Sequence, residues 1–475
     1  MSYLSINPYS GEQVFSAETL SSEQIKSMLA KSAEAFLCWK ASLYRQRAEL
    51  LFKVADLLEE RADEYAAMIT SEMGKLRHEA VAEVFKCAAG CRYYAENAEI
   101  FLSDKLIDAC GSRTIVSIQP LGAVLAVMPW NFPFWQVIRC ASAAIMAGNC
   151  VVLKHASNVG ICAGALEKLF LDAGAIEGLF INLYISSSQV AEVIADPVIA
   201  AVALTGSEAA GRSVASLAGQ AIKPSLLELG GSDPFIVLGD ADIEFAVENA
   251  LSSRYMNAGQ SCIAAKRFVV VDSVADKFVE LFKQKVQLLT VGDPALESTT
   301  LAPMARKDLC EELHQQVQDA VGCGATVVIG CEYYGDSCIY PASIIDNVTE
   351  QMRVYNEEVF GPVATIIRVK DEAEAVAVAN GSRFGLGGSV WTSDSDKGES
   401  IARSLECGNA FVNSIVKSDP KAPFGGIKES GYGRELSEYG IKEFVNIKTL
   451  SVSYHSGSDT EEEKDSKLYR AVEQR

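Results

Sequence analysis

Short apolar segments alternate with helix-like segments along the middle of the chain, and this alternation constrains the fold more than any other feature. Each apolar segment is only long enough for a strand, and each is followed by a segment whose apolar residues have helical spacing. The pairs are 151–154 with 159–173, 199–204 with 207–219, and 234–238 with 242–255. Such pairs form βαβ units, so we predict an α/β fold with a parallel sheet covered by helices.

A second series of apolar segments follows and predicts a second α/β domain. These segments are residues 267–271, 326–329, 363–368 and 388–391. Ahead of the first series, residues 48–97 have the spacing of long amphipathic helices, and residues 114–127 are predicted to form one strand. We find no internal repeat.

The composition is that of a globular protein and argues against nucleic acid and membranes as partners. The 475 residues allow two or three domains, and 49% hydrophobic residues supply their cores. The net charge of −20 repels nucleic acid phosphates and acidic lipid surfaces. The longest apolar stretch, residues 121–147, contains Pro129, Pro133 and Arg139, so we do not expect it to cross a membrane.

Cysteine usage indicates a reducing compartment. The 13 cysteines are an odd number without a CxxC pair or a disulfide-like spacing, so most are expected to be free thiols. Residues 1–13 lack the basic and apolar regions of a signal peptide. We therefore expect a cytoplasmic protein, with a disordered tail at the polar residues 456–475.

Cys262 is the candidate nucleophile. It follows Asn-Ala-Gly-Gln-Ser at 257–261, so small and amide-bearing residues surround the thiol. A thiolate attacks a carbonyl carbon readily, but the thiol requires a lowered pKa to do so at neutral pH. Most cysteines are buried and inert, and the local sequence alone barely separates Cys262 from the others.

Glu228 is the candidate general base. It lies between Leu227 and Leu229 and precedes a Gly-Gly pair, which favours partial desolvation of its carboxylate. Desolvation raises a carboxyl pKa toward the working range of a general base. A solvated or helix-capping glutamate is the ordinary alternative and stays open at this point.

The histidines favour neither a protease dyad nor a metal site. They are His78, His155, His314 and His455; none is near Cys262 in the sequence, and no pair has metal-ligand spacing. We therefore predict no metal. Residues 205–211 follow a predicted strand and open a helix whose backbone N–H groups are suited to a phosphate, although an ordinary capped helix is the more frequent explanation.

Six motifs occur in one order along the chain. They are Pro-Trp-Asn-Phe-Pro at 129–133, Leu-Thr-Gly-Ser at 204–207, Glu-Leu-Gly-Gly at 228–231, Gly-Gln-Ser-Cys at 259–262, Glu-Val-Phe-Gly-Pro at 358–362 and Phe-Gly-Gly-Ile-Lys-Glu-Ser-Gly at 424–431. With them the chain resembles the aldehyde dehydrogenase superfamily from about residue 5 to residue 453. Within it, the chain looks most like the shorter bacterial succinate semialdehyde dehydrogenases. Glu-Met-Gly-Lys at 72–75 resembles an N-terminal mark of the same family.

The resemblance implies a mechanism. Cys262 attacks the aldehyde carbon, and the side-chain amide of Asn131 and the N–H of Cys262 stabilise the oxyanion. Hydride passes to the nicotinamide of NADP or NAD, and Glu228 activates the water that hydrolyses the remaining thioester.

The resemblance also implies a dinucleotide site. Glu358 holds the nicotinamide ribose, Phe360 packs near the ring, and Trp130 belongs to the same site. Gly206 and Ser207 fall where the pyrophosphate meets a helix start.

Lys154 and Ser157 bear on the choice of dinucleotide. Lys154 resembles the family lysine that contacts the adenosine ribose. Three residues later, NAD-preferring members often have a glutamate that repels a 2′-phosphate, whereas this chain has Ser157. We predict that NADP is accepted, with NAD as the alternative.

Arg139, Trp135 and Phe424 are the predicted substrate residues. In semialdehyde-specific relatives an arginine at the place of Arg139 binds the distal carboxylate, while Trp135 and Phe424 are expected to wall the channel. A second arginine of some relatives is Met256 here, which weakens this prediction and leaves Lys417 as a guess. The alternatives are a dehydrogenase for glutarate semialdehyde or for an aliphatic or aromatic aldehyde, or a non-catalytic protein that keeps the fold.

The family architecture implies three parts and a homodimer or homotetramer. Strands outside the two main sheets need a partner for their edges, so they are expected to form the oligomerisation module. The predicted parts are a Rossmann-like cofactor domain at 1–101 and 121–229, an α/β catalytic domain at 230–429, an oligomerisation module at 102–120 and 441–455, and the tail at 456–475.

Overall fold

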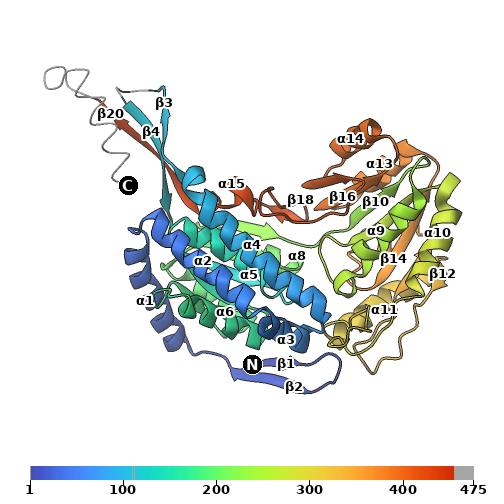
Figure 1. Cartoon of the computed structure of the whole chain (residues 1–475), viewed down its shortest axis with the longest axis horizontal. Helices are drawn as coiled ribbons and strands as arrows, with labels where there is room; N and C mark the ends of the chain where they lie inside the picture. Colours follow the sequence, from blue (N-terminus) through green and yellow to red (C-terminus); the bar gives the residue numbers. More distant parts are fainter. Residues whose placement is uncertain (1, 110, 112, 454–475) are drawn as a thin grey trace.

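Two α/β lobes and a smaller β-sheet arm make up the molecule (Figure 1). The computed structural model describes residues 2–109, 111 and 113–453, so the predicted tail at 456–475 lies outside the described residues. The α/β fold class with two main sheets is confirmed. None of the helices in the described ranges is both long enough and apolar enough to span a bilayer.

The first lobe is built on a six-stranded sheet in the order β19-β9-β8-β5-β6-β7. Its strands are β5 (Ala123–Met128), β6 (Cys150–His155), β7 (Phe180–Asn182), β8 (Ile199–Thr205), β9 (Ser225–Glu228) and β19 (Gly431–Tyr432). Strands β5 to β9 are parallel, and β19 is antiparallel to β9. The strand order reverses between β5 and β8, and ligand crevices open at such switch points, beyond the carboxyl ends of the strands.

Helices cover both faces of this sheet, and the long helices predicted for residues 48–97 are confirmed. The helices of the first lobe are α1 (Ser22–Trp39), α2 (Tyr44–Glu60), α3 (Ala62–Met73), α4 (Arg77–Leu102), α5 (Trp135–Met146), α6 (Gly160–Asp172), α7 (Val190–Ala195), α8 (Glu208–Gln220) and α15 (Ser437–Gly440). All 12 residues of α5 are buried. The long apolar stretch at 121–147 is therefore a core strand followed by a core helix.

The second lobe holds a seven-stranded sheet in the order β12-β13-β14-β11-β10-β16-β17. Its strands are β10 (Asp233–Val237), β11 (Ala265–Val271), β12 (Thr326–Ile329), β13 (Ser343–Asp346), β14 (Val363–Val369), β16 (Gly387–Trp391) and β17 (Asn409–Val412). Its helices are α9 (Ile243–Tyr255), α10 (Asp272–Val286), α11 (Lys307–Gly322), α12 (Arg353–Asn356), α13 (Glu372–Asn380) and α14 (Ser395–Ser404). The alternation of strands and helices predicted parallel pairing, and every pair is parallel except one: β12 pairs with β13 in antiparallel direction.

The arm is an antiparallel sheet of β3 (Lys105–Ile107), β4 (Arg113–Pro120) and β20 (Val445–Val452), and it projects from the first lobe (Figure 1). The prediction of one strand over 114–127 was wrong, because β4 lies in the arm while β5 lies in the first sheet. The apolar run continues through both strands, so its periodicity does not mark the change of sheet. Two short antiparallel pairs complete the fold: β1 (Ser2–Ile6) with β2 (Gln13–Glu18), and β15 (Phe384–Gly385) with β18 (Ile427–Lys428).

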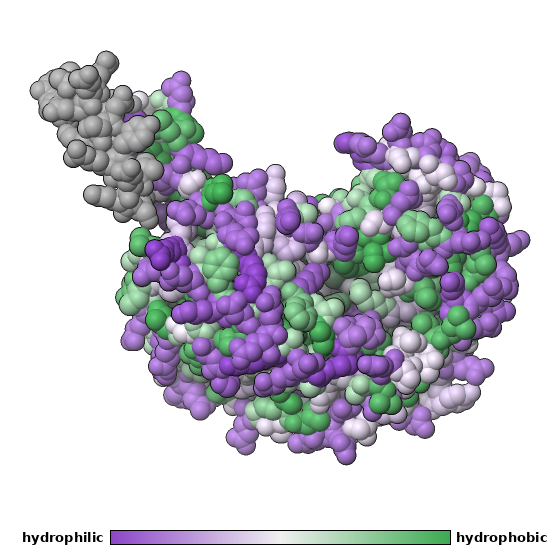
Figure 2. Space-filling model, viewed as in Figure 1, coloured by the Kyte–Doolittle hydropathy of each residue, from purple (hydrophilic) through white to green (hydrophobic). Residues whose placement is uncertain are grey.

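The chain crosses back to the first lobe after the second sheet is complete. Strand β19 pairs with β9, and Phe424, Leu436 and Phe444 pack in the core of the first lobe. The surface is hollowed between the two lobes (Figure 2). Residues near the C-terminal end of the chain therefore pack in the first lobe together with residues from its N-terminal half.

Candidate active site

Two cavities meet at Cys262. One has a volume of about 780 Å³ and is lined by Asn131 and Phe360, among others. The other has a volume of about 580 Å³ and is lined by Trp135. Cys262 and Gln136 line both cavities. A thiol in this position has access to a ligand on each side, and both volumes lie in the range of small-molecule and cofactor sites.

The loop before Cys262 has a strained backbone. Asn257 and Ala258 have φ angles of 53° and 52°, in the left-handed region that residues other than glycine rarely adopt. Arg254, fully buried at the end of α9, donates a hydrogen bond of 2.7 Å to the carbonyl oxygen of Gly259. Strain of this kind persists only where the surroundings impose it, and it concentrates at functional sites.

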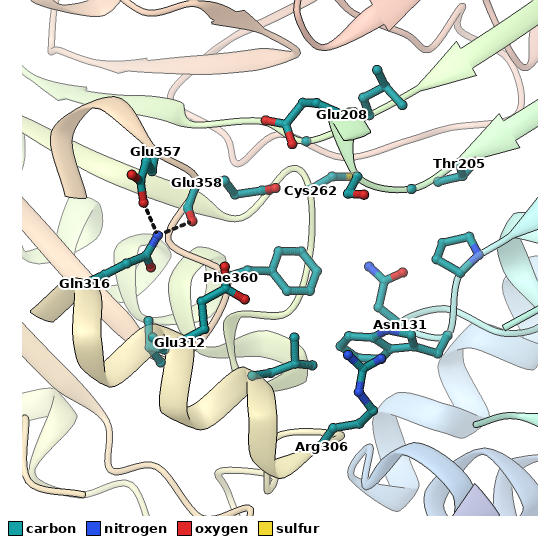
Figure 3. Close-up of a pocket in the computed structure, with 18 of the residues that line it drawn as sticks. Asn131, Thr205, Glu208, Cys262, Arg306, Glu312, Gln316, Glu357, Glu358 and Phe360 are labelled. Atoms are coloured by element: carbon teal, nitrogen blue, oxygen red, sulfur yellow. Dashed lines mark hydrogen bonds between the residues drawn. The ribbon is translucent and has the colours of Figure 1, made fainter. Parts of the chain in front are cut away.

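Asn131 follows β5 and lies beside this loop. Its Nδ2 donates to the carbonyl oxygen of Gln260 at 3.1 Å, and its Oδ1 accepts from Nε2 of Gln136 at 3.0 Å. The side chains of Asn131 and Phe360 face one another across the larger cavity (Figure 3). The hydrogen bonds hold the amide in one orientation next to the thiol.

A buried ion pair supports the segment that carries Asn131. Nζ of Lys75 contacts Glu83 and donates to the carbonyl oxygen of Asn131 at 2.9 Å. Glu83 also accepts hydrogen bonds from the N–H groups of Phe134 and Trp135. Loss of either charged partner would leave the other charge buried and unpaired, so the pair rigidifies the segment.

Burial raises the pKa of the Cys262 thiol to about 12, with Lys266 and Arg139 opposing the increase. Lys266 is fully buried and donates to the carbonyl oxygens of Ser261 and Cys262 at 2.7 and 2.6 Å. The thiol therefore does not have the lowered pKa that attack at neutral pH requires. Burial outweighs the two cations, because desolvation penalises the thiolate.

Glu228 ends β9 and is enclosed by the protein, with 1% of its surface exposed. Neither carboxylate oxygen has a hydrogen-bond partner in the described part of the chain. Burial, and then the charge of Glu435, raises the pKa of Glu228 well above its ordinary value, with Arg139 opposing. The desolvation predicted from the flanking leucines is confirmed, and a raised pKa makes this carboxylate a stronger base than an exposed glutamate.

The larger cavity opens at the switch point between β5 and β8. Gly206 and Ser207 line it where the 13-residue helix α8 begins. Ser207 caps this helix, since its Oγ accepts from the N–H of Ala210 at 3.4 Å. The positive end of the helix dipole and its free N–H groups make this corner of the cavity suited to an anion.

An aromatic pair and a carboxylate also line the larger cavity. The rings of Trp130 and Phe360 meet edge to face with centroids 5.9 Å apart. Oε1 of Glu358 accepts from the N–H of Gly231 at 3.1 Å and lies 3.1 Å from Nζ of Lys266. Figure 3 shows Glu358 beside Cys262, with Gln316 donating to its carbonyl oxygen.

These residues fit a nicotinamide dinucleotide. The helix start suits a pyrophosphate, the carboxylate suits ribose hydroxyls, and the aromatic pair suits a planar ring. A Cβ at Gly230 would lie 2.5 Å from Oε2 of Glu358, so glycine makes room for this carboxylate. No cluster of metal-ligating side chains occurs within residues 2–109, 111 and 113–453.

Lys154 and Ser157 do not line the larger cavity. They lie at and just beyond the carboxyl end of β6, the strand next to β5, and Ser157 is exposed. Burial lowers the pKa of Lys154, which has no carboxylate within ion-pair distance among the described residues. Their place at the same edge of the sheet agrees with the adenosine end of a dinucleotide, although their roles stay predictions.

The smaller cavity contains the three predicted substrate residues, Trp135, Arg139 and Phe424. Arg139 is 3% exposed, and its Nε lies 2.5 Å from Oε2 of Glu435. Its Nη2 donates to Oγ1 of Thr205 at 3.2 Å, and its guanidinium lies 5.2 Å from the ring centroid of Phe424. Glu435 is therefore an ion-pair partner of Arg139 inside the protein, although burial raises the pKa of this carboxyl group, with Arg139 opposing.

Comparison with known proteins identifies the family, because residues 2–450 match the aldehyde dehydrogenase family. The chain belongs to this family. The NADP-dependent succinate-semialdehyde dehydrogenase of Mycobacterium avium strain 104 is 46% identical over 464 residues, which are 97% of this chain and 98% of that protein. The probable NADP-dependent succinate-semialdehyde dehydrogenase of Synechocystis is 45% identical over 95% of this chain and its own full length. The succinic semialdehyde dehydrogenase of Streptococcus pyogenes, solved with NADP+, superposes with a TM-score of 0.93 at 39% identity, over 95% of this chain and all of that chain.

In this aldehyde dehydrogenase the fold assembles most of the predicted site residues around two cavities. Cys262, Asn131, Trp130, Gly206, Ser207, Glu358 and Phe360 line the larger cavity; Cys262, Trp135, Arg139 and Phe424 line the smaller one. The sequence did not predict the charged side chains that support these residues. Lys75 belonged to a recognised motif without an assigned role, and Glu435 has no local motif. Glu435 reaches the site through backbone pairing with Phe424, a contact that spacing does not reveal.

Proposed function

We propose that this aldehyde dehydrogenase oxidises succinate semialdehyde to succinate with NADP, or alternatively NAD, as the hydride acceptor. The observation that carries the proposal is the Cys262 thiol at the junction of a dinucleotide-type cavity and a second cavity with cationic side chains. The relatives from Mycobacterium avium and Synechocystis, named for this reaction with NADP, support it. Lys86 and Arg139 in the second cavity favour a carboxylated aldehyde over an apolar one.

Cys262 carries the covalent chemistry. Its sulfur adds to the aldehyde carbon, and the oxygen of the resulting thiohemiacetal becomes negatively charged. Nδ2 of Asn131 and the backbone N–H of Cys262 donate to this oxygen, and that N–H has no acceptor among the described residues. Residues that line the larger cavity, among them Ser207 and Glu358, would hold the dinucleotide, which would supply the hydride acceptor; loss of hydride from the same carbon would leave a thioester on Cys262.

Glu228 is the proposed base for the water that hydrolyses the thioester. The thiol has a raised pKa, so its proton passes to water in the cavity as the C–S bond forms; the charge of Glu228 opposes ionisation of this thiol. In the second half of the reaction Glu228 takes a proton from the water that attacks the thioester. Its burial keeps bulk water away; Glu228 itself lines neither cavity, but its neighbours Leu229 and Gly230 line the larger one, from which the water would reach it.

The proposed substrate is tested with the wild-type enzyme in an absorbance assay for the reduced nicotinamide. Succinate semialdehyde, glutarate semialdehyde, butyraldehyde and benzaldehyde are each assayed with NADP and with NAD. We expect kcat/KM for succinate semialdehyde to exceed that for butyraldehyde by about tenfold to a hundredfold, the effect of one charge-assisted contact. A preference for butyraldehyde or benzaldehyde would reject the proposed substrate class.

The proposed use of NADP depends on Ser157. The substitution Ser157→Glu is expected to lower kcat/KM for NADP by about tenfold to a hundredfold, because a carboxylate repels the 2′-phosphate. The value for NAD should change less than about threefold, as for a surface substitution. Ser157→Ala is the matched control, since it removes the hydroxyl without adding charge. An unchanged NADP value in the glutamate variant would show that residue 157 does not meet the phosphate.

We also propose a homodimer or homotetramer joined through the arm. Leu106 and Ile447 expose 64% and 63% of their surface there, and Leu450 exposes 44%. Exposed apolar side chains on a small sheet are typical of strands that pair with a second chain. Sedimentation equilibrium measures the number of subunits.

We also propose the cytoplasm as the compartment. The free state of every described cysteine supports this proposal, and cell fractionation tests it.

A further inference from the structure

The segment that carries Asn131 has no regular secondary structure of its own. Residues 129–134 connect β5 to α5 and contain Pro129 and Pro133, neither of which has an N–H group to donate. A side chain on such a segment is positioned less precisely than one on a helix or a strand, so neighbouring groups have to hold its backbone. The proposed oxyanion donor, Nδ2 of Asn131, depends on this support, because its effect depends on where it points.

Lys75 provides the charged part of this support. It lies in the short link between α3 and α4 and is fully buried. Its Nζ donates to the carbonyl oxygen of Asn131 at 2.9 Å, contacts Glu83, and lies 3.8 Å from the ring centroid of Phe132. A charge-assisted hydrogen bond is stronger than a neutral one, and burial excludes the water that would compete for it. One ammonium group therefore holds the backbone of Asn131 and the ring that follows it.

Glu83 extends the support to the start of α5. Its Oε1 accepts from the N–H groups of Phe134 at 2.9 Å and Trp135 at 3.0 Å, while its other oxygen contacts Lys75. The first N–H groups of a helix have no acceptor within the helix, and a carboxylate there is favourable. The ion pair therefore holds the segment on both sides of Pro133.

The loop of Cys262 meets the same carbonyl oxygen of Asn131. Nδ2 of Asn257 donates to this oxygen at 2.9 Å, and the N–H of Asn257 donates to Glu79 of α4 at 3.0 Å. Of the two donors to this oxygen, Lys75 is the charged one. The carbonyl group thus joins the ion pair to the strained loop that leads to the nucleophile.

We propose that Lys75, held by Glu83, is a positioning residue for the oxyanion donor Asn131. This assignment rests on the proposed function, in which Nδ2 of Asn131 stabilises the oxyanion. Lys75 lines the smaller cavity, but its ammonium group is paired with Glu83 and donates to the backbone, so it supports the reaction without binding the aldehyde. A displacement of about 1 Å in a group that acts on the transition state can lower the rate by about a hundredfold.

The test is a double-mutant cycle in kcat for the oxidation of succinate semialdehyde. Asn131→Ala alone is expected to lower kcat by about 10²- to 10³-fold. Lys75→Met alone is expected to lower kcat by about tenfold to a hundredfold, because an oxyanion forms both when the thiol adds and when water attacks the thioester. KM should change less than about threefold, since the lost interaction belongs to the transition state. Once Asn131→Ala is present, Lys75→Met should lower kcat further by less than about twofold, because no amide remains to be misplaced.

Arg368→Met is the matched control for loss of a cation from an ion pair. Nη2 of Arg368 lies 2.8 Å from Oδ2 of the buried Asp346, and neither residue lines either of the two cavities. This variant should have a lower thermal midpoint of unfolding, but its kcat should stay within about twofold of the wild type. If Lys75→Met does not fold, Lys75→Met combined with Glu83→Gln leaves no unpaired buried charge, keeps an acceptor for the start of α5, and carries the same expectation.

The outcomes separate this inference from the proposed function. An Asn131→Ala variant with the wild-type kcat overturns the oxyanion step of the proposed function and the inference together. When Asn131→Ala is slow, either an unchanged kcat in Lys75→Met or a higher KM with unchanged kcat overturns the role of Lys75 alone. The same fold loss from Lys75→Met with and without Asn131→Ala also overturns it, because a residue that only stabilises the fold would act equally in both.

Discussion

Replacement of Cys262 by alanine abolishes aldehyde oxidation, with kcat/KM lower by at least about 10⁴-fold, because the thiohemiacetal and the thioester both require its sulfur. The reaction is followed as formation of reduced nicotinamide with saturating aldehyde. Cys338→Ala is the control: that cysteine is half-exposed, lines neither cavity, and should leave the rate unchanged. An alanine variant of Cys262 that oxidises aldehyde at the wild-type rate would remove the basis of the proposed mechanism.

The same thiol should show its raised pKa in a direct titration. Only the thiolate is alkylated, and a thiol with a pKa of about 12 is almost entirely protonated at pH 7. The rate of iodoacetamide modification at Cys262, read by peptide mass spectrometry, should therefore rise about tenfold per pH unit between pH 7 and 10 without a plateau. A plateau near neutral pH would show instead that Lys266 and Arg139 outweigh burial in setting the pKa of this thiol.

Replacement of Glu228 by glutamine should separate the two halves of the reaction. The amide cannot take a proton from water, so the thioester forms but hydrolyses slowly, and steady-state kcat falls by about 10²- to 10⁴-fold. Stopped-flow absorbance should show a burst of reduced nicotinamide close to one equivalent per active site, followed by a slow phase. Mass spectrometry of the quenched protein should find the acyl group on Cys262.

Glu438→Gln serves as the control for charge loss. Glu438 is half-exposed on α15 and pairs only with Lys442 among the described residues, so its substitution should change kcat less than about twofold. If the Glu228 variant loses the burst as well as the steady state, Glu228 is needed to deprotonate the thiol. If it loses neither, another group activates the water.

Local features of the sequence predicted a large part of the fold and of the site. The apolar segments at 151–154, 199–204 and 234–238 became parallel strands, because a buried strand needs only a short apolar run. The motifs around Asn131, Glu228 and Cys262 named residues that the fold brings together. Burial of Glu228 also followed from its neighbours, since Leu227 in the same strand and Leu229 just after it are both buried.

Charge pairing and solvent exclusion were decided only by the tertiary structure. The sequence predicted Arg139 as a substrate residue but not its ion pair with Glu435, because Glu435 is 296 positions away by the residue numbers and approaches only when the chain returns to the first lobe. The sequence determined which chemical groups exist and on which element each one lies. The pKa of Cys262 and the availability of each cation depend on which distant groups and how much water surround them, and local sequence does not contain that information.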